Sequence, residues 1–237
     1  MKKIKVVLFD LDGTLLPMDL DVFMEHYLRS LTRKVAMHGY DPKTFSDAIM
    51  KGIVASLKND GSDTNENTFW RVFSEACGEK TVEKHIFEEF YSNDFGKLRA
   101  TCGYNPEARR AVMKIKEMGF RVALATNPAF PETATYQRME WAGFSPWDFE
   151  LVTTYENSSY CKPSPAYYTE LTEKLSVAPD ECLMVGNDTR DDLACLKCGI
   201  PVFLLTDCLI NKNGTDVSRY PHGGFAELVE YVEKINK

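Results

Sequence analysis

The chain has 237 residues, of which 44% are hydrophobic and 27% charged, and its formal net charge is −7. This composition is typical of a folded globular protein and excludes a disordered one; the length suffices for one full domain and a smaller second one. The acidic balance argues against a general nucleic-acid-binding protein, because such proteins need a basic face to neutralise phosphates.

The N-terminal segment MKKIKVVLFDLDG is predicted to form the first strand. It has a positive start, but its apolar run is short, ends in acids and has no small-residue cleavage site, so it does not resemble a secretory signal. No apolar run approaches the roughly 20 residues that span a bilayer. The seven cysteines are an odd number without the pattern of a disulfide framework. We therefore expect a cytoplasmic protein with free thiols and no membrane partner, in which Cys195 and Cys198 pack in a helix.

Residues from about 20 to 95 show apolar side chains at helical spacing and no strand pattern. Phe23, Tyr27 and Leu31 form one such stripe, and Phe45 and Ile49 belong to the next. Two further stripes near residues 70 and 87 complete a predicted insert of four helices. The polar run at 59–67 is predicted to be a loop inside it.

After about residue 105, helices and apolar strands alternate. Helices are predicted at 106–119, 131–143, 165–175 and 225–235, with one more ending at Gly199; strands are predicted at 121–126, 149–153, 182–186 and 201–206. Near-continuous apolar strands that alternate with helices indicate a parallel sheet covered on both faces. The predicted fold is an α/β doubly wound, Rossmann-like core made of residues 1–17 and 98–237, with an α-helical domain inserted at 18–97.

Ligands of such sheets bind beyond the carboxyl ends of the strands, where the strand order reverses. Three of the predicted strands lead into FDLDGT, LATN and MVGNDTRDD, and the loop CKPSP carries a lysine. We therefore expect these segments to meet at one edge of the sheet. Their chemistry-bearing residues are Asp10, Asp12, Thr126, Lys162, Asp188, Asp191 and Asp192.

Asp10 and Asp12 are two residues apart in an extended segment, so their side chains leave the chain on the same side. Two such close carboxylates repel unless a cation compensates them, and Mg²⁺ is the cation that suits carboxylates, waters and a substrate phosphate. One carboxylate can then attack phosphorus while the other exchanges protons with the leaving alcohol and with water. Lys162 and the Thr126 hydroxyl can neutralise and position the phosphoryl group.

The four segments, in this order, resemble the four motifs of the haloacid dehalogenase superfamily of phosphohydrolases, and they extend from Asp10 to Asp192. The resemblance implies that Asp10 is the nucleophile. It implies that Asp12 is the general acid and base and offers its backbone carbonyl to the metal. Thr126 and the N–H of Asn127 would hold the phosphoryl oxygens, with Lys162 neutralising charge between them and the nucleophile. The helical insert resembles the mobile cap of this family.

The fourth motif departs from the usual Gly-Asp pattern, because the chain has Gly186-Asn187-Asp188. Either the Asn187 oxygen or the Asp188 carboxylate can be the metal ligand, and the sequence favours Asp188, since a carboxylate binds Mg²⁺ better than an amide. Asp192, rather than Asp191, matches the acid that orients Lys162 or a metal-bound water.

Residues behind these motifs are expected to support them. Gly13 allows the backbone to turn tightly after the acids, and Thr14 follows it in the same motif. The segment LLTDCLINKNGTD, residues 204–216, is either a loop near the site or an ordinary surface connection. The aromatic stripe at Phe69, Trp70 and Phe73 is predicted to be core, with substrate contact as the alternative.

The leading hypothesis is a Mg²⁺-dependent phosphatase that hydrolyses a small phosphorylated metabolite through an aspartyl-phosphate. Within the same superfamily, a dehalogenase is disfavoured by Asp12, a phosphonate hydrolase needs a reactive cap lysine, and a phosphomutase excludes water from the intermediate. A non-catalytic binding module on the same fold is the alternative from another class. The sequence carries no signal for oligomeric state.

Overall fold

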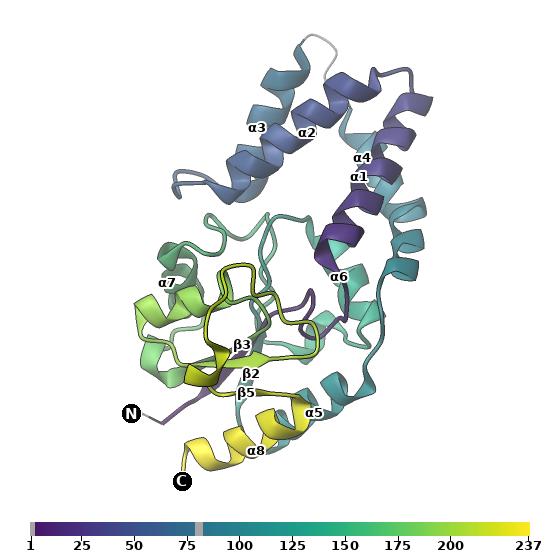
Figure 1. Cartoon of the computed structure of the whole chain (residues 1–237). Helices are drawn as coiled ribbons and strands as arrows, with labels where there is room; N and C mark the ends of the chain where they lie inside the picture. Colours follow the sequence, from purple (N-terminus) through teal and green to yellow (C-terminus); the bar gives the residue numbers. More distant parts are fainter. Residues whose placement is uncertain (1–2, 79–82) are drawn as a thin grey trace.

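The computed structural model of the protein describes residues 3–78 and 83–237 (Figure 1). Residues 1–2 of the predicted core segment and 79–82 of the predicted insert lie outside the described residues. Among the helices that are described, none combines the length and apolarity needed to cross a bilayer.

Within the described residues, five parallel strands form one sheet in the order β2-β1-β3-β4-β5. They are β1 (Val6–Phe9), β2 (Arg121–Leu124), β3 (Cys182–Gly186), β4 (Val202–Leu205) and β5 (His222–Gly223). Val7 of β1 is in register with Val122 on one side and Leu183 on the other. The chain therefore reverses its direction of winding beside β1, and this is the place where an open α/β sheet binds ligands.

Helices cover both faces of the sheet, as the doubly wound fold requires. The covering elements are α5 (Pro106–Glu117), α6 (Glu132–Trp141), α7 (Pro165–Lys174), α8 (Phe225–Ile235) and the 3₁₀ helix η5 (Asp192–Cys198). Alternate residues of a strand point to opposite faces. Val7 and Phe9 pack in the cluster that contains α5 and α8, whereas Val6 and Leu8 pack in the cluster with α7 and η5. The predicted α/β class is confirmed.

Four helices of the described chain form the insert, here called the cap. They are α1 (Leu20–Met37), α2 (Pro42–Leu57), α3 (Asn65–Cys77) and α4 (Lys84–Asn93), followed by the 3₁₀ helix η2 (Phe95–Thr101). Acidic caps start the first two: Asp19 accepts from the N–H of Val22, and Asp41 accepts from the N–H of Thr44. In Figure 1 the cap lies at the opposite end of the molecule from α5 and α8.

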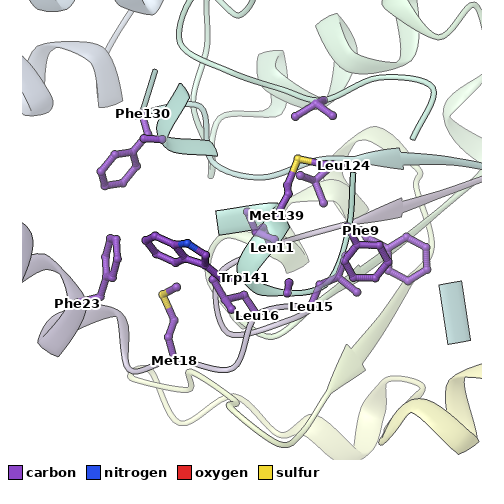
Figure 2. Close-up of a cluster of buried hydrophobic side chains, with 14 of the residues drawn as sticks. Phe9, Leu11, Leu15, Leu16, Met18, Phe23, Leu124, Phe130, Met139 and Trp141 are labelled. Atoms are coloured by element: carbon purple, nitrogen blue, oxygen red, sulfur yellow. The ribbon is translucent and has the colours of Figure 1, made fainter. Parts of the chain in front are cut away.

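An aromatic cluster joins the root of the cap to the core. Phe23 of α1 meets Phe130 of the core edge-on, with ring centroids 6.2 Å apart, and Phe95 of η2 stacks on Trp141 of α6 at 5.4 Å. Figure 2 shows this cluster continuing toward Phe9 at the end of β1. Burial of these rings holds α1 above the edge of the sheet that carries the first motif.

A second attachment lies at the start of α3, where Asn65 is fully buried. Its Nδ2 donates to the carbonyl oxygens of Pro128 and Tyr160, at 3.2 and 3.3 Å, and its backbone N–H donates to the carbonyl of Ser158 at 2.8 Å. Among the described residues, the cap is therefore attached to the core through an apolar cluster at its root and through polar contacts at the start of α3, with further polar contacts such as that of Gln137 Nε2 to the Tyr91 carbonyl.

The structure corrects the start of one predicted helix and the extent of one predicted strand. Helix α3 begins inside the predicted loop at 59–67, because the Thr64 side chain caps it by accepting from the N–H of Asn67. The predicted strand at 149–153 forms only an isolated bridge between Leu124 and Val152. This segment runs along β2 immediately after a 3₁₀ turn, Pro146–Asp148, and is too short for a regular strand.

Two further elements differ in kind from the prediction. The helix ending before Gly199 is the 3₁₀ helix η5, which Gly199 closes with φ of +82°. Strand β5 was not predicted, since its two residues, His222 and Gly223, have no apolar pattern.

We predict that Asn65→Ala lowers the free energy of unfolding by about 1–3 kcal/mol, because two buried core carbonyls lose their donor. Asn67→Ala is the matched control. Asn67 is exposed on the same helix, and its amide bonds only to Asp63. Urea unfolding of the two variants measures the difference; equal stabilities would contradict a role of Asn65 in holding the cap.

Candidate active site

A cavity of about 810 Å³ is lined by residues of the cap and by the carboxyl ends of the strands. The predicted site residues on its wall are Asp10, Asp12, Thr126, Asn127, Lys162, Asn187, Asp188, Asp191 and Asp192. The structure thus brings together side chains from four segments that are up to 182 residues apart, from 10 to 192 in the sequence. Gly13 and Thr14 lie behind this wall.

Lys162 is buried at the centre of the site, between two carboxylates. Its ammonium donates to Asp10 Oδ1 at 2.9 Å and to Asp192 Oδ1 at 2.7 Å. Burial disfavours the charged lysine, yet Asp10 and Asp192 together raise the pKa of Lys162 well above its ordinary value. A permanent positive charge therefore lies beside the predicted nucleophile.

The buried environment of Asp10 shifts its ionisation. Burial raises the pKa of Asp10 to about 7; the Lys162 charge opposes this rise, and the nearby carboxylates of Asp192 and Asp12 add to it. One lysine thus compensates only part of the negative charge that these acids concentrate at the edge of the sheet.

Asp192 is fixed by the backbone that follows β3. Its Oδ2 accepts from the N–H groups of Asn187 and Asp188, at 3.0 and 2.9 Å, while its Oδ1 binds Lys162. The close approach requires Gly186, because a Cβ there would lie 2.1 Å from Asp192 Oδ2. Asp192 thus holds the Lys162 ammonium with one carboxylate oxygen while backbone donors immobilise the other.

The Thr14 hydroxyl connects the first and fourth motifs. It lies 3.0 Å from Asn187 Oδ1 and 3.3 Å from Asp10 Oδ2. Gly13 has φ of +80°, and a Cβ at this position would lie 2.2 Å from Asn187 Nδ2. Glycine is thus needed here both for its backbone conformation and for the approach of Asn187 to the acids.

Asp188 uses its carboxylate differently from Asn187. Asp188 Oδ1 accepts from the backbone N–H groups of Arg190 and Asp191, at 2.7 and 3.1 Å, so it closes the turn that follows β3. The Asn187 oxygen, in contrast, is turned toward Thr14 and Asp10. The Asn187 oxygen thus shares the Thr14 hydroxyl with the predicted nucleophile, Asp10.

Asp12 forms an ion pair that the sequence did not reveal. Its Oδ2 accepts from the guanidinium of Arg138, a residue of α6 with no exposed surface. The same guanidinium lies 4.4 Å from the ring centroid of Phe130, which packs on α1 of the cap. Arg138 thus links the second acid of the site to the aromatic root of the cap.

Thr126 is positioned through its own backbone. Its carbonyl accepts from the hydroxyls of Thr153 and Tyr167, at 2.7 and 3.0 Å, directly after β2 pairs with β1. These two bonds hold the turn in which Thr126 and Asn127 face the cavity. The segment around 149–153 supports the second motif in this way.

Three buried side-chain atoms lack a hydrogen-bond partner among the described residues: Asp12 Oδ1, Asn127 Oδ1 and Trp70 Nε1. All three residues line the cavity. A buried polar atom without a partner costs free energy, so this wall is built to meet a polar ligand.

The oxygen-rich wall fits a hard cation such as Mg²⁺ when backbone and amide oxygens contribute. The described residues contain no group of three or more His, Cys, Asp or Glu side chains that could hold a metal by themselves. Asp10 and the Asn187 oxygen converge on Thr14, however, and Asp12 retains an unpaired oxygen. Mg²⁺ commonly takes one or two carboxylates and completes its shell with waters and phosphate, which agrees with this donor set.

The segment 204–216 lies near the site, which decides between its two readings. The Cys208 carbonyl accepts from Asn187 Nδ2 at 2.7 Å, and Ile210 bridges to Asp188 and lines the cavity. The aromatic stripe divides: Phe73 is fully buried core, whereas Phe69 and Trp70 reach the cavity wall.

Sequence reasoning missed Arg138 and Asn65, and for Arg138 a signal existed. Ala134, Arg138 and Trp141 follow one another at helical spacing and are all buried. A charged residue on the apolar stripe of a helix indicates a buried ion pair. Asn65 gave no such signal, because it lies in a polar run.

Comparison with known proteins agrees with the fold and the site. A family model described as haloacid dehalogenase-like hydrolase matches residues 4–199. A phosphoglycolate phosphatase of Vibrio cholerae is 28% identical over 218 residues, covering 87% of this chain and 86% of that protein. The pyrophosphatase PpaX of Bacillus cereus is 27% identical over 199 residues, covering 80% of this chain and 77% of that protein. The crystal structure of a HAD phosphatase from Thermococcus onnurineus has a TM-score of 0.60 at 18% identity, covering 99% of this chain and 100% of that chain.

The protein has a parallel sheet with an inserted helical cap, and acids gather where the strands end. These features are typical of hydrolases of the α/β class. The chain belongs to the haloacid dehalogenase-like hydrolases. The resemblance seen in the four motifs is confirmed, and with it the prediction of an enzyme of this phosphatase family.

We predict that Arg138→Gln lowers the free energy of unfolding by about 3 kcal/mol or more, because the carboxylate of Asp12 stays buried without its counter-charge. Arg109→Gln is the control. Arg109 pairs with Asp148 at 3.0 Å but is 43% exposed, so its loss is expected to cost about 1 kcal/mol or less. Urea unfolding measures the loss of stability in each variant. A loss for Arg138→Gln as small as that expected for Arg109→Gln would show that the Arg138–Asp12 pair contributes little to stability.

Proposed function

We propose that the protein is a Mg²⁺-dependent phosphatase that hydrolyses a small phosphorylated metabolite through an aspartyl-phosphate on Asp10. The observation that carries the proposal is the buried Lys162 between Asp10 and Asp192, in a cavity that Asp12 and Thr126 also line. A cytoplasmic location and the absence of a nucleic-acid or membrane partner remain predictions of the sequence.

In the first step a carboxylate oxygen of Asp10 attacks phosphorus, and the bond to the leaving oxygen breaks. Lys162 and Thr126 stabilise the charge on the phosphoryl oxygens, with the N–H of Asn127 beside them. With substrate bound, Asp12 carries a proton on Oδ1 while Oδ2 still accepts from Arg138, and it gives this proton to the departing alcohol.

In the second step Asp12, now ionised, takes a proton from water, and the oxygen of that water attacks the phosphorus of the acyl phosphate. The bond between phosphorus and Asp10 breaks, which releases inorganic phosphate and restores the free carboxylate. The cap, attached at its aromatic root and at Asn65, limits the access of other water to the intermediate.

Mg²⁺ would be held by Asp10, the backbone carbonyl of Asp12 and the Asn187 oxygen, and it would neutralise the acids and withdraw charge from the phosphoryl group. We assign Asn187 rather than Asp188 on geometry, since Asn187 Oδ1 shares the Thr14 hydroxyl with Asp10. Asp188 is then the turn-closing acid of the fourth motif.

We predict that Asp10→Asn lowers the rate of phosphate release from an aryl phosphate by at least about 1,000-fold, because the amide cannot form the acyl phosphate. EDTA is expected to abolish the wild-type activity, and added Mg²⁺ to restore it. Asp207→Asn is the control, since Asp207 is exposed and does not line the cavity. Turnover that survives chelation or Asp10→Asn would refute the mechanism.

We also predict that the affinity for Mg²⁺ rises with pH until about pH 7 and then levels. The pKa of Asp10 is raised to about 7, chiefly by burial, so below that pH the cation must displace a proton from this carboxyl. Calorimetric titrations with Mg²⁺ at several pH values measure how the dissociation constant for Mg²⁺ depends on pH.

Two variants separate this effect from other acids of the site. Asp10→Asn should abolish the pH dependence. Asp191→Asn should retain it, although burial and the charge of Asp188 raise the pKa of Asp191 to about 6. An affinity for Mg²⁺ that is constant below pH 7 would show that Asp10 is not a ligand.

A further inference from the structure

The cap half of the cavity combines an apolar surface with charged groups, since Lys58, Glu66, Lys84 and Glu88 line it as well. Leu20 and Met24 of α1, Ile53 and Leu57 of α2, and Phe87 of α4 line it. The side chain of Leu57 is 40% exposed and that of its neighbour Val54 is 41% exposed, although both line the cavity. Apolar surface is thus left open to the active site, where burial by a ligand would stabilise a complex.

Trp70 forms the wall of this half of the cavity together with Phe69 and Phe87. Its indole meets Phe87 edge-on with ring centroids 4.9 Å apart and Phe69 at 5.3 Å. Lys84, paired with Glu66 at 3.6 Å, lies 5.0 Å from the centroid of the Trp70 ring. The indole is therefore held in one orientation by its surroundings.

The Trp70 Nε1 atom adds a polar feature to this apolar wall. The atom itself is buried and makes no hydrogen bond of normal geometry among the described residues, and the hydroxyl of Tyr155, another residue of the cavity wall, lies near it. The other two such atoms, Asp12 Oδ1 and Asn127 Oδ1, belong to the core end. The cavity thus has an end rich in acids, with Lys162, in the core and an aromatic end bordered by charged side chains in the cap.

We propose that the cap half of the cavity is a subsite for a planar heteroaromatic ring carried by the leaving alcohol of the substrate. The proposal rests on the phosphatase function proposed above and names its substrate class: a phosphate monoester of a ring-bearing alcohol of about nucleoside size. The ring packs against Trp70 and Phe69.

The volume of the cavity favours this class over a small polar ester. About 810 Å³ is within the range of sites that enclose drug-sized ligands of roughly 300–1,000 Å³. The relatives named for phosphoglycolate and for pyrophosphate carry the names of small, highly charged substrates. The aliphatic and aromatic side chains of the cap form a surface that such anions do not use, although Lys58 and Lys84 also line this half.

The test compares two nucleotide esters that carry a ring base with one sugar ester that lacks it. Uridine and adenosine 5′-monophosphate share the primary phosphate ester and the sugar of ribose 5-phosphate, so their intrinsic reactivities match. With Mg²⁺ and the full chain, kcat/KM for the better nucleotide is expected to exceed that for ribose 5-phosphate by at least about tenfold, or 1.4 kcal/mol. Equal or lower values for both nucleotides would overturn the proposal.

Variants in the cap test whether the advantage of the nucleotides over ribose 5-phosphate arises there. Trp70→Leu should remove most of the ring advantage and change the turnover of ribose 5-phosphate by less than about twofold. Val54→Trp fills the cavity from a partly exposed position where folding is not at risk, and should have the same selective effect. Trp147→Leu is the matched control, because Trp147 is 92% exposed and outside the cavity. A uniform loss for all three esters in both cap variants would also overturn the proposal.

A binding measurement separates this proposal from the proposed function. Titration of the Asp10→Asn variant with uridine 5′-monophosphate, adenosine 5′-monophosphate and ribose 5-phosphate in the presence of Mg²⁺ requires no turnover. At least about tenfold tighter binding of a nucleotide supports the ring subsite even if no ester is hydrolysed. Equal dissociation constants refute the subsite even if the protein proves to be a phosphatase.

Discussion

The burial of Lys162 between Asp10 and Asp192 is the constraint around which the site is built. A buried ammonium is tolerated only with carboxylate partners, and buried carboxylates need the ammonium in return. The backbone after β3 must therefore donate to Asp192, and Gly186 must lack a side chain for that donation to occur. Three parts of the chain are placed by this one group of charges, and the remaining excess of negative charge explains why a divalent cation suits the site.

The cap and the core are coupled at the same edge of the sheet. Arg138 pairs with Asp12 and packs on Phe130, and Phe130 meets Tyr27 of α1 with ring centroids 5.2 Å apart. A change in the position of α1 would thus act on the Asp12 carboxylate. The polar attachment at Asn65 holds the other side of the cap. The position of the cap and the surroundings of Asp12 therefore depend on connected packing.

Much of the fold could be predicted because its signals are local. Apolar stripes at helical spacing predicted the helices of the cap, and apolar runs before the acids predicted β1 and β3. The errors fell where the signal was weak. Residues 65–67 look like loop by composition but belong to α3, capped by Thr64, and the segment at 149–153 has strand-like residues with only one bridge to pair them. The two residues of β5 carry no periodicity at all.

The sequence by itself determined which chemical groups the protein has at the ends of its strands: the acids of the first motif, Thr126, Lys162 and the acids of the fourth. Local patterns are sufficient for this, because contiguous stretches of sequence identify the strand ends and the order of the motifs. Only the tertiary structure decided which groups touch. It paired Arg138 with Asp12, and it placed the Thr14 hydroxyl between Asn187 and Asp10 while Asp188 closes a turn. It also opened an aromatic wall in the cap to the cavity. The physical reason is that burial and pairing are properties of contacts between distant segments, and no local pattern encodes them.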